Sequence, residues 1–252
     1  MSEPMSPAPP PPGPPPTGGG YAPPPSPNRP GLPWDNGKDF NTLLETAKQL
    51  ITAPARAYAD MREKGDYASP LIFALVFIVI SAVAQAVWQI IGIGGSTAWM
   101  DQLGSMDPEV AEMVAAYGTV SAGSAIAGIF TSLIGGLIGL FLISGLFHLM
   151  LMILGALKDS SAGFEGTFRT VSYTQVVQLA ALIPFAGPLI ALVWGIILYT
   201  IGLASVHRTT QGKAVAAVLI PFVICCVCIL VAVFALMGTI MAALGAGAAA
   251  GN

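Results

Sequence analysis

One histidine stands in an apolar stretch of the sequence and is the first residue that could do chemistry. His148 lies near the end of residues 113–157, a run without Asp, Glu, Lys or Arg. An ionisable group at membrane depth is a candidate for proton transfer or metal binding, because placing it there is costly. A neutral imidazole that donates to a neighbouring carbonyl explains the residue as well, so both interpretations stay open.

A second set of polar residues precedes and enters another apolar run. Glu165 and Arg169 are four residues apart, in the order that favours an i,i+4 ion pair on a helix. Tyr173, Gln175 and Gln178 follow on the same predicted helix. They either line a polar groove or make interhelical hydrogen bonds worth roughly 0.6 kcal/mol each, and we favour the hydrogen bonds.

The remaining reactive residue types do not form a recognisable centre. Cys225, Cys226 and Cys228 lack a second cysteine pair or nearby histidines, so we expect no metal site, no cofactor and no disulfide. His207 is adjacent to Arg208, and we expect it at the membrane surface near lipid phosphate. The sequence contains no phosphate-binding loop, catalytic triad or carboxylate pair, which predicts a non-enzymatic protein.

The element that must position these residues is a helical hairpin. Residues 170–206 contain no Asp, Glu, Lys, Arg or His, and as a helix they would measure roughly 55 Å, nearly twice the hydrocarbon core of a bilayer. Pro184 and Pro188 interrupt this run near its middle. The sequence therefore predicts two membrane spans joined by a turn.

Several stretches around this hairpin resemble the bacterial form of the Yip family of Ypt-interacting proteins. They begin at Ser69 (SPLIFALVFIVIS), Gly163 (GFEGTFRTVSYTQ), Ile183 (IPFAGPLIALVWGIILYTIGL) and His207 (HRTTQGKA), and the resemblance covers roughly residues 38–240. It implies a five-span helical membrane protein with a cytosolic N-terminus. Eukaryotic members are associated with small GTPases and vesicle traffic, whereas most bacterial members have no assigned biochemical role.

The composition supports the same class. Hydrophobic residues make up 54 % of the chain and charged residues only 9 %, against about a quarter charged in soluble domains. The fold class we predict is all-α, a polytopic membrane protein with five transmembrane helices, preceded by an amphipathic interfacial helix and a disordered Pro-rich tail. The predicted spans cover residues of about 70–93, 126–156, 170–184, 188–206 and 214–236 within a membrane domain over 69–240.

The segments outside the membrane domain differ in composition. Residues 1–33 are dominated by Pro, Gly and Ser, which predicts a disordered cytoplasmic tail that is either a spacer or a docking site for protein partners. Residues 34–68 should form cytoplasmic or interfacial helices, because apolar residues of 40–51 fall on one helix face. That face should lie in the lipid headgroups or fold against the bundle. A Gly/Ala tail over 241–252 ends the chain.

Small residues repeat along the second predicted span, at Gly128, Ser132, Gly135 and Gly139. Such a stripe lets another helix approach closely. The approaching helix belongs either to the same chain, which we favour, or to a second copy in a homo-oligomer.

The distribution of positive charge predicts the orientation. All ten Lys and Arg lie before span one, between spans two and three, or between spans four and five. By the positive-inside rule those segments are cytoplasmic, so the N-terminus is inside and the C-terminus outside, in what we expect to be a bacterial cytoplasmic membrane. A net charge of −3 gives no reason to expect nucleic-acid binding.

We predict a membrane scaffold or trafficking adaptor; the alternative is a subunit of a small-solute transporter or channel that uses the Pro-broken hairpin at Pro184–Pro188.

Overall fold

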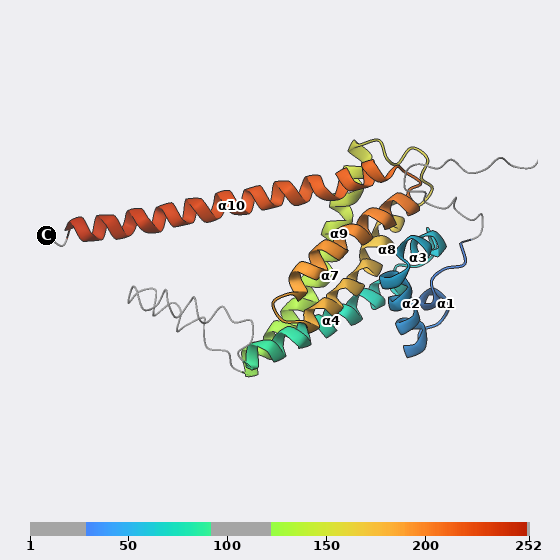
Figure 1. The fold of residues 1–252 in the computed structure, drawn as a ribbon, viewed down its shortest axis with the longest axis horizontal. Coiled ribbons are helices and arrows are strands. Elements are labelled where there is room, and N and C mark those ends of the chain that lie inside the picture. Colours follow the sequence, from blue (N-terminus) through green and yellow to red (C-terminus); the bar gives the residue numbers. More distant parts are fainter. Residues whose placement is uncertain (1–28, 92–121, 251–252) are drawn as a thin grey trace, which may run out of the picture.

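The computed structural model describes residues 29–91 and 122–250, and every regular element in these ranges is a helix (Figure 1). The predicted all-helical class is therefore confirmed. In chain order the elements are α1 (Pro33–Asn36), α2 (Phe40–Thr52), α3 (Pro54–Asp60), α4 (Ala68–Ile90), α7 (Ala122–Ile153), α8 (Gly163–Thr174), the 3₁₀ helix η1 (Gln175–Leu182), α9 (Gly187–Val206) and α10 (Gln211–Ala250).

Four of these helices are long and apolar enough to cross a membrane. They contain Ala68–Ile90, Ala125–Ile153, Gly187–Val206 and Gln211–Thr239. Many of their large apolar side chains are exposed, among them Phe130, Leu142 and Phe234. Exposed side chains of this kind need an apolar solvent, and the hydrocarbon of a bilayer provides one. An integral membrane protein is therefore the class that this fold defines.

The predicted third span, residues 170–184, is not a single helix. It begins within α8, continues as the 3₁₀ helix η1 and ends at a turn. Neither part alone has the length of a spanning helix, so four of the five expected helices meet that criterion. Residues 166–176 are all buried, because α4, α7 and α9 surround them. The first half of this pass is therefore enclosed by other helices, whereas Leu182 and Ile183 near its end are exposed.

The turn after η1 has the geometry that its sequence dictates. Pro188 stands in the first turn of α9, where its missing N–H costs nothing. Gly187 is required at its position, because a Cβ atom there would lie 2.2 Å from the backbone oxygen of Ala180. Phe185 adopts a positive φ of 61°, which reverses the chain between η1 and α9. The predicted hairpin is thus present, with η1 and α9 packed against each other.

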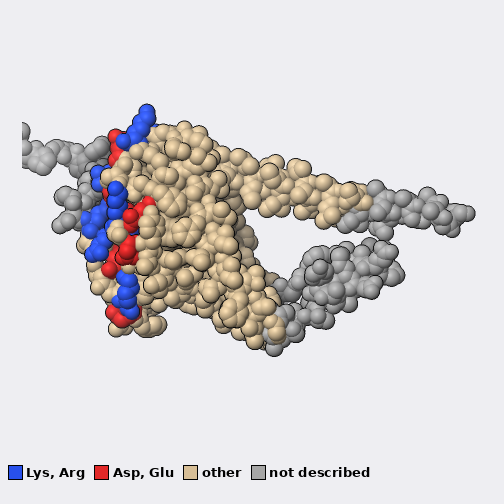
Figure 2. Space-filling view, turned by 180° about the vertical axis from the view of Figure 1, so that it is seen from behind, with Lys and Arg blue, Asp and Glu red and all other residues tan. Residues whose placement is uncertain are grey.

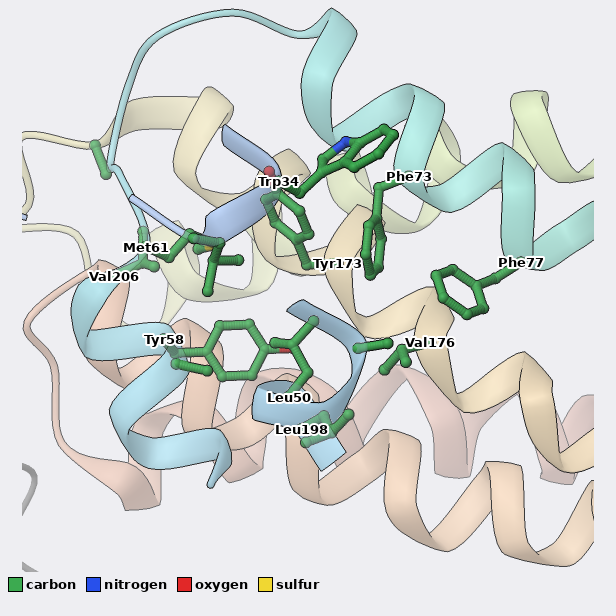
Figure 3. Packing of buried hydrophobic residues seen from close by; sticks show 14 residues of the cluster. Trp34, Leu50, Tyr58, Met61, Phe73, Phe77, Tyr173, Val176, Leu198 and Val206 are labelled. Carbon is green, nitrogen blue, oxygen red and sulfur yellow. The ribbon is translucent and has the colours of Figure 1, made fainter. Parts of the chain in front are cut away.

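The amino-terminal helices close one end of the bundle with a shared hydrophobic core (Figure 3). Trp34 of α1 meets Phe73 of α4 edge to face, and Phe73 contacts Tyr173 of α8 at a centroid distance of 5.0 Å. Tyr58 of α3 is fully buried, and its hydroxyl lies 2.7 Å from Thr174 Oγ1. Each buried aromatic or aliphatic side chain contributes roughly 1.5–3 kcal/mol, so α1–α3 form one folding unit with the bundle.

The ordered chain begins before the boundary expected from composition. Leu32 is fully buried, and the side chain of Arg29 donates to the carbonyl oxygens of Tyr58, Met61 and Ser205. Residues 29–33 therefore belong to the folded domain rather than to the tail that we placed over 1–33. The part of that predicted tail over residues 1–28 lies outside the described residues.

The apolar face of α2 is partly buried against the bundle and partly exposed. Asp39 caps it by accepting from the N–H groups of Asn41 and Thr42. Ala47 and Leu50 pack into the core, whereas Phe40 (74 % exposed) and Leu44 (58 %) point away from it. One half of the helix face thus packs on the bundle, and the other half is free to meet a second apolar surface.

Helix α10 packs on the bundle only through its first turns. Ala214, Ala217 and Val218 are buried, and the described side chains beyond them are exposed or half-buried. Figure 1 shows the helix leaving the bundle and running alone toward the C-terminus. It continues as helix through Ala250, so residues 241–250 extend α10 rather than beginning the separate Gly/Ala tail that composition suggested.

Candidate functional site

Charged side chains gather at one end of the molecule (Figure 2). All ten Lys and Arg of the sequence fall within the described residues, in the loops and short helices at this end and, for Lys213, in the first turn of α10. The first residues of α4 and α10 and the last residues of α7 and α9 lie there too, as their sequence neighbours show. We refer to this as the charged end, and it contains the most constrained polar contacts of the protein.

A buried ion pair between α1 and α8 is the centre of this end. Arg169 Nη2 donates to Asp35 Oδ1 at 2.6 Å, and the two side chains are 1 % and 2 % exposed. The Tyr173 hydroxyl donates to the same oxygen at 2.5 Å. The other carboxylate oxygen accepts from the backbone N–H of Leu32 at 3.1 Å. Asp35 therefore fastens the amino-terminal segment to α8 through charge-assisted hydrogen bonds.

The predicted pair of Glu165 and Arg169 exists but is secondary. Their closest atoms are 3.9 Å apart, and Glu165 accepts a shorter hydrogen bond of 2.6 Å from the backbone N–H of Gly65. Arg169 Nη1 donates to the backbone oxygen of Asp66 at 2.8 Å. Both side chains thus hold the connection between α3 and α4, a role that their spacing in sequence did not indicate.

A second ionic contact fixes the start of the described chain. Arg29 Nε lies 3.3 Å from Glu63 Oε1, an ion pair without hydrogen-bond alignment, and Arg208 Nη2 donates to the same oxygen at 2.8 Å. Ser161 Oγ donates to the other oxygen at 2.7 Å. Burial of this carboxyl favours its neutral form, but these hydrogen bonds and positive charges outweigh it and lower the pKa of Glu63.

The two histidines meet through a threonine hydroxyl. His148 Nδ1 and His207 Nε2 lie 2.9 and 2.8 Å from Thr167 Oγ1, and Ser160 Oγ lies 2.7 Å from His207 Nδ1. A hydroxyl has one proton, so Thr167 donates to one ring and accepts from the other. The expectation for His207 was wrong, because it is fully buried rather than exposed to lipid phosphate. Burial and the neighbouring His148 lower the pKa of His207 to about 4, so it is neutral near pH 7.

The two glutamines that follow Arg169 in the sequence, Gln175 and Gln178, lie on the 3₁₀ helix η1. Gln175 is buried and donates to the backbone oxygen of Val171 and to the Tyr199 hydroxyl, both at 3.2 Å. Gln178 donates to Gln175 Oε1 in a longer contact of 3.4 Å. Beside them are two cavities of about 430 and 340 Å³, and Ser81, Gln85 and Gln178 line both.

The small-residue stripe of α7 does not pack where its spacing indicated. Among the described residues, no atom lies within 4 Å of a Cβ built at Gly128, Gly135 or Gly139. The close contact is instead at Gly136, where a Cβ would meet Ile78 of α4 at 2.9 Å. Ser132 is exposed, and it lines the smaller cavity together with Gly135 and Gly139. Close packing at Gly128, Gly135 and Gly139 is therefore not found among the described residues, and the choice between a helix of the same chain and a second copy stays a prediction.

The remaining candidates are scattered. Cys225, Cys226 and Cys228 lie on the free part of α10, two of them exposed and one half-buried. No group of three His, Cys, Asp or Glu side chains that could hold a metal ion occurs in residues 29–91 and 122–250. The polar site residues named from sequence therefore lie in three separate places: Arg169 and Tyr173 beside Asp35, His148 beside His207, and Gln175 and Gln178 beside the two cavities.

Sequence reasoning missed Asp35, Trp34 and Glu63. Asp35 and Arg169 are 134 residues apart, and no local spacing connects them. A signal was present in Trp34 and Asp35, an aromatic and an acid directly after the Pro-rich tail, since such a pair has little reason to occur in a segment without packing partners.

The fold and the charged end define an α-helical integral membrane protein with a helical cap over one end of its bundle. Within this class, residues 48–248 match the model of the Yip1 domain, which is most of the chain. The chain belongs to the Yip1 domain family, as the resemblance of its hairpin indicated. No curated protein and no solved structure matched it. The match begins inside α2, so α1, with Trp34 and Asp35, precedes the family domain.

Proposed function

We propose that the chain is a non-enzymatic, five-span membrane adaptor of the Yip type, with its charged end in the cytoplasm. The observation that carries the orientation is that all ten Lys and Arg lie at one end of the bundle. Basic loops remain on the cytoplasmic side during insertion. The N-terminus is then inside and the C-terminus outside, in a bacterial cytoplasmic membrane.

Five crossings are supported by the geometry of the third pass. Between Arg169, at the charged end, and the turn, the last five residues of α8 and the eight of η1 rise by about 1.5 and 2.0 Å each, which gives roughly 24 Å. That length is most of the ~30 Å hydrocarbon core. The 3₁₀ geometry lengthens the apolar part by about 4 Å over an α-helix of the same residues. A crossing enclosed by α4, α7 and α9 also tolerates the polar side chains that would be costly in lipid.

The adaptor role is supported by how the tail joins the domain. Arg29 and Asp35 tie the segment that follows the Pro-rich residues to α3, α8 and the end of α9. A partner held by the tail would therefore be held at a fixed place against the membrane domain. The exposed half of α2, with Phe40 and Leu44, would enter the lipid headgroups beside it.

Affinity capture from membranes with the full chain and with a chain beginning at residue 29 tests this role. The shorter chain keeps every described contact, so it should insert and fold normally. The adaptor proposal requires partners that the full chain captures and the shorter chain loses. If both chains capture the same proteins, and if proteoliposomes of the full chain pass small solutes, the transporter alternative replaces it.

A further inference from the structure

The glutamine-lined cavities are features that the adaptor role does not use. The larger one lies among α4, η1, the turn at Pro184 and the start of α9. The smaller one lies among α4, α7 and η1. Ser81, Gln85 and Gln178 border both, so they form a polar seam between two open spaces. We call the seam and its two cavities the amide groove.

The groove offers hydrogen-bonding groups to which the described residues supply no partner. Gln85 Nε2 donates to Ser81 Oγ at 3.0 Å, and Gln178 Nε2 makes only a 3.4 Å contact. Among the described residues, neither the Oε1 of Gln85 nor that of Gln178 accepts a hydrogen bond. Polar groups that lack partners in apolar surroundings cost free energy, so a hydrogen-bonding occupant would be stabilised there.

The lining also restricts the charge of that occupant. None of the described residues that line either cavity is Asp, Glu, Lys, Arg or His. A phosphate would have no counter-charge, and burying an unpaired charge is far more costly than burying a hydroxyl. Amide oxygens accept hydrogen bonds from hydroxyl groups, and amide N–H groups donate to hydroxyl oxygens. The chemistry fits a neutral, hydroxyl-bearing group.

The walls of the groove indicate that this group is attached to apolar chains. Ile78, Leu140 and Ile143 line the smaller cavity, and Phe185, which is 76 % exposed, lines the larger one. Ile143 is also 39 % exposed on α7. Exposed apolar side chains at its edges leave the groove open toward the lipid rather than enclosed by protein.

We propose that the amide groove binds a lipid with a neutral, hydroxyl-bearing headgroup. The headgroup lies on Gln85 and Gln178, and the acyl chains leave past Ile143. The 3₁₀ helix contributes directly, because it brings Gln175 and Gln178 to this side of the bundle. This inference needs the chain to be in a membrane but does not depend on the adaptor role.

Native mass spectrometry of the full chain, released from micelles with added lipid, tests the proposal. The probes are dioleoylglycerol carrying one galactose, and dioleoyl phosphatidylglycerol, which has the same acyl chains and a hydroxyl-bearing headgroup with two hydroxyl groups instead of four, and adds a phosphate. The galactolipid should bind more tightly. The double variant Gln85→Met, Gln178→Met should weaken its binding roughly sevenfold, or ~1.2 kcal/mol for two hydrogen bonds of ~0.6 kcal/mol at ~1.4 kcal/mol per tenfold change.

Two further variants keep the test decisive if the double variant does not fold. Gly135→Leu places a side chain in the smaller cavity, where a Cβ meets nothing within 4 Å, and should reduce binding without unfolding the bundle. Val83→Met, on the exposed side of α4, is the matched control and should bind as wild type does.

Three outcomes would overturn the proposal. The first is equal binding of the galactolipid and phosphatidylglycerol. The second is wild-type binding by both the glutamine variant and Gly135→Leu. The third is displacement of the galactolipid by methyl galactoside at similar concentration, because it would show that the groove takes a solute rather than a lipid.

Discussion

Replacing Asp35 by Asn tests whether the amino-terminal segment is held by the buried ion pair. The substitution preserves the shape of the side chain and leaves an oxygen for the Tyr173 hydroxyl. It removes the negative charge that lies 2.6 Å from Arg169 Nη2, in surroundings where both side chains are at most 2 % exposed. The guanidinium would remain buried, with Glu165 at 3.9 Å as the remaining carboxylate partner among the described residues.

The expected loss is large for a single substitution. Removing one partner of a buried ion pair costs about 3–5 kcal/mol, because the other charge stays desolvated. At roughly 2–4 °C per kcal/mol for a chain of this size, the Tm should fall by about 6–20 °C. If the segment around α1 detaches, Arg169 becomes solvated and part of this loss of stability is avoided. Trypsin would then cut at Lys38 under conditions in which it leaves the wild type intact.

The assay is thermal unfolding in detergent, followed by tryptophan fluorescence. Trp34 is buried next to Asp35, and its indole donates to the backbone oxygen of Ser69 at 2.8 Å, so it reports detachment of α1 directly. The matched control is Asp60→Asn. Its partner Arg56 is 3.8 Å away and 86 % exposed, and such surface pairs contribute at most ~0.5 kcal/mol.

A double variant separates charge from packing. Adding Arg169→Met to Asp35→Leu removes both charges together, and apolar replacements of a buried pair are often close to neutral. The double variant should therefore recover roughly half or more of the loss seen with Asp35→Asn. A Tm shift for Asp35→Asn no larger than that of Asp60→Asn, with Lys38 still protected, would refute the reasoning.

Three further predictions concern packing, pH and the tail. Gly136→Leu should lose about 1–3 kcal/mol by overpacking against α4, whereas Gly135→Leu, its neighbour on α7, should keep the wild-type Tm. The pKa of His207 is lowered from 6.5 to about 4 in the folded protein by burial, then by His148 and Arg29, against the opposing charge of Glu63. The unfolded chain therefore binds more protons between these values, stability should fall as pH drops from 6.5 to 4, and His207→Asn should flatten that profile. Deleting residues 1–28 should leave the Tm unchanged, whereas Arg29→Ala should lower it, because that side chain holds three buried carbonyl groups.

Hydropathy and charge predicted the parts of the fold that depend on the membrane. The predicted spans 70–93 and 188–206 correspond closely to α4 and α9, since a bilayer requires about twenty consecutive apolar residues. The turn between η1 and α9 was also predictable, because two prolines and a glycine leave the chain few alternatives. These features are local, so one sequence is enough to recognise them.

The burial and the 3₁₀ geometry of the third pass could not be predicted from the local sequence. Its apolar composition predicted a membrane span, but composition does not distinguish lipid contact from burial between helices. The change from α to 3₁₀ geometry at Gln175 depends on the neighbours that enclose the segment, and no residue in it marks the change. The Asp35–Arg169 pair was unpredictable for a similar reason, since each residue looks like a surface charge in its own segment.

The close helix contact of α7 lies one position away from the glycines that spacing selected. Spacing selected Gly135 and Gly139, whereas the close contact to Ile78 is at Gly136. One residue turns a helix face by about 100°, so Gly136 contacts Ile78 of α4, whereas a Cβ at Gly135 or Gly139 meets no described residue within 4 Å. Periodicity identifies which residues share a face, but the direction of that face is set by the tertiary contacts.

The crossing of α8 and η1 is the central claim, because it fixes the number of spans and the side of every later segment. Labelling with a membrane-impermeant maleimide tests it most directly, in the full chain with Cys225, Cys226 and Cys228 replaced by Ser. A cysteine introduced by Ala186→Cys, in the turn after η1, should react from outside intact cells, and one introduced by Gly212→Cys should react only after permeabilisation. The reverse pattern, or protection of position 186 in intact cells, would contradict five spans and the proposed orientation.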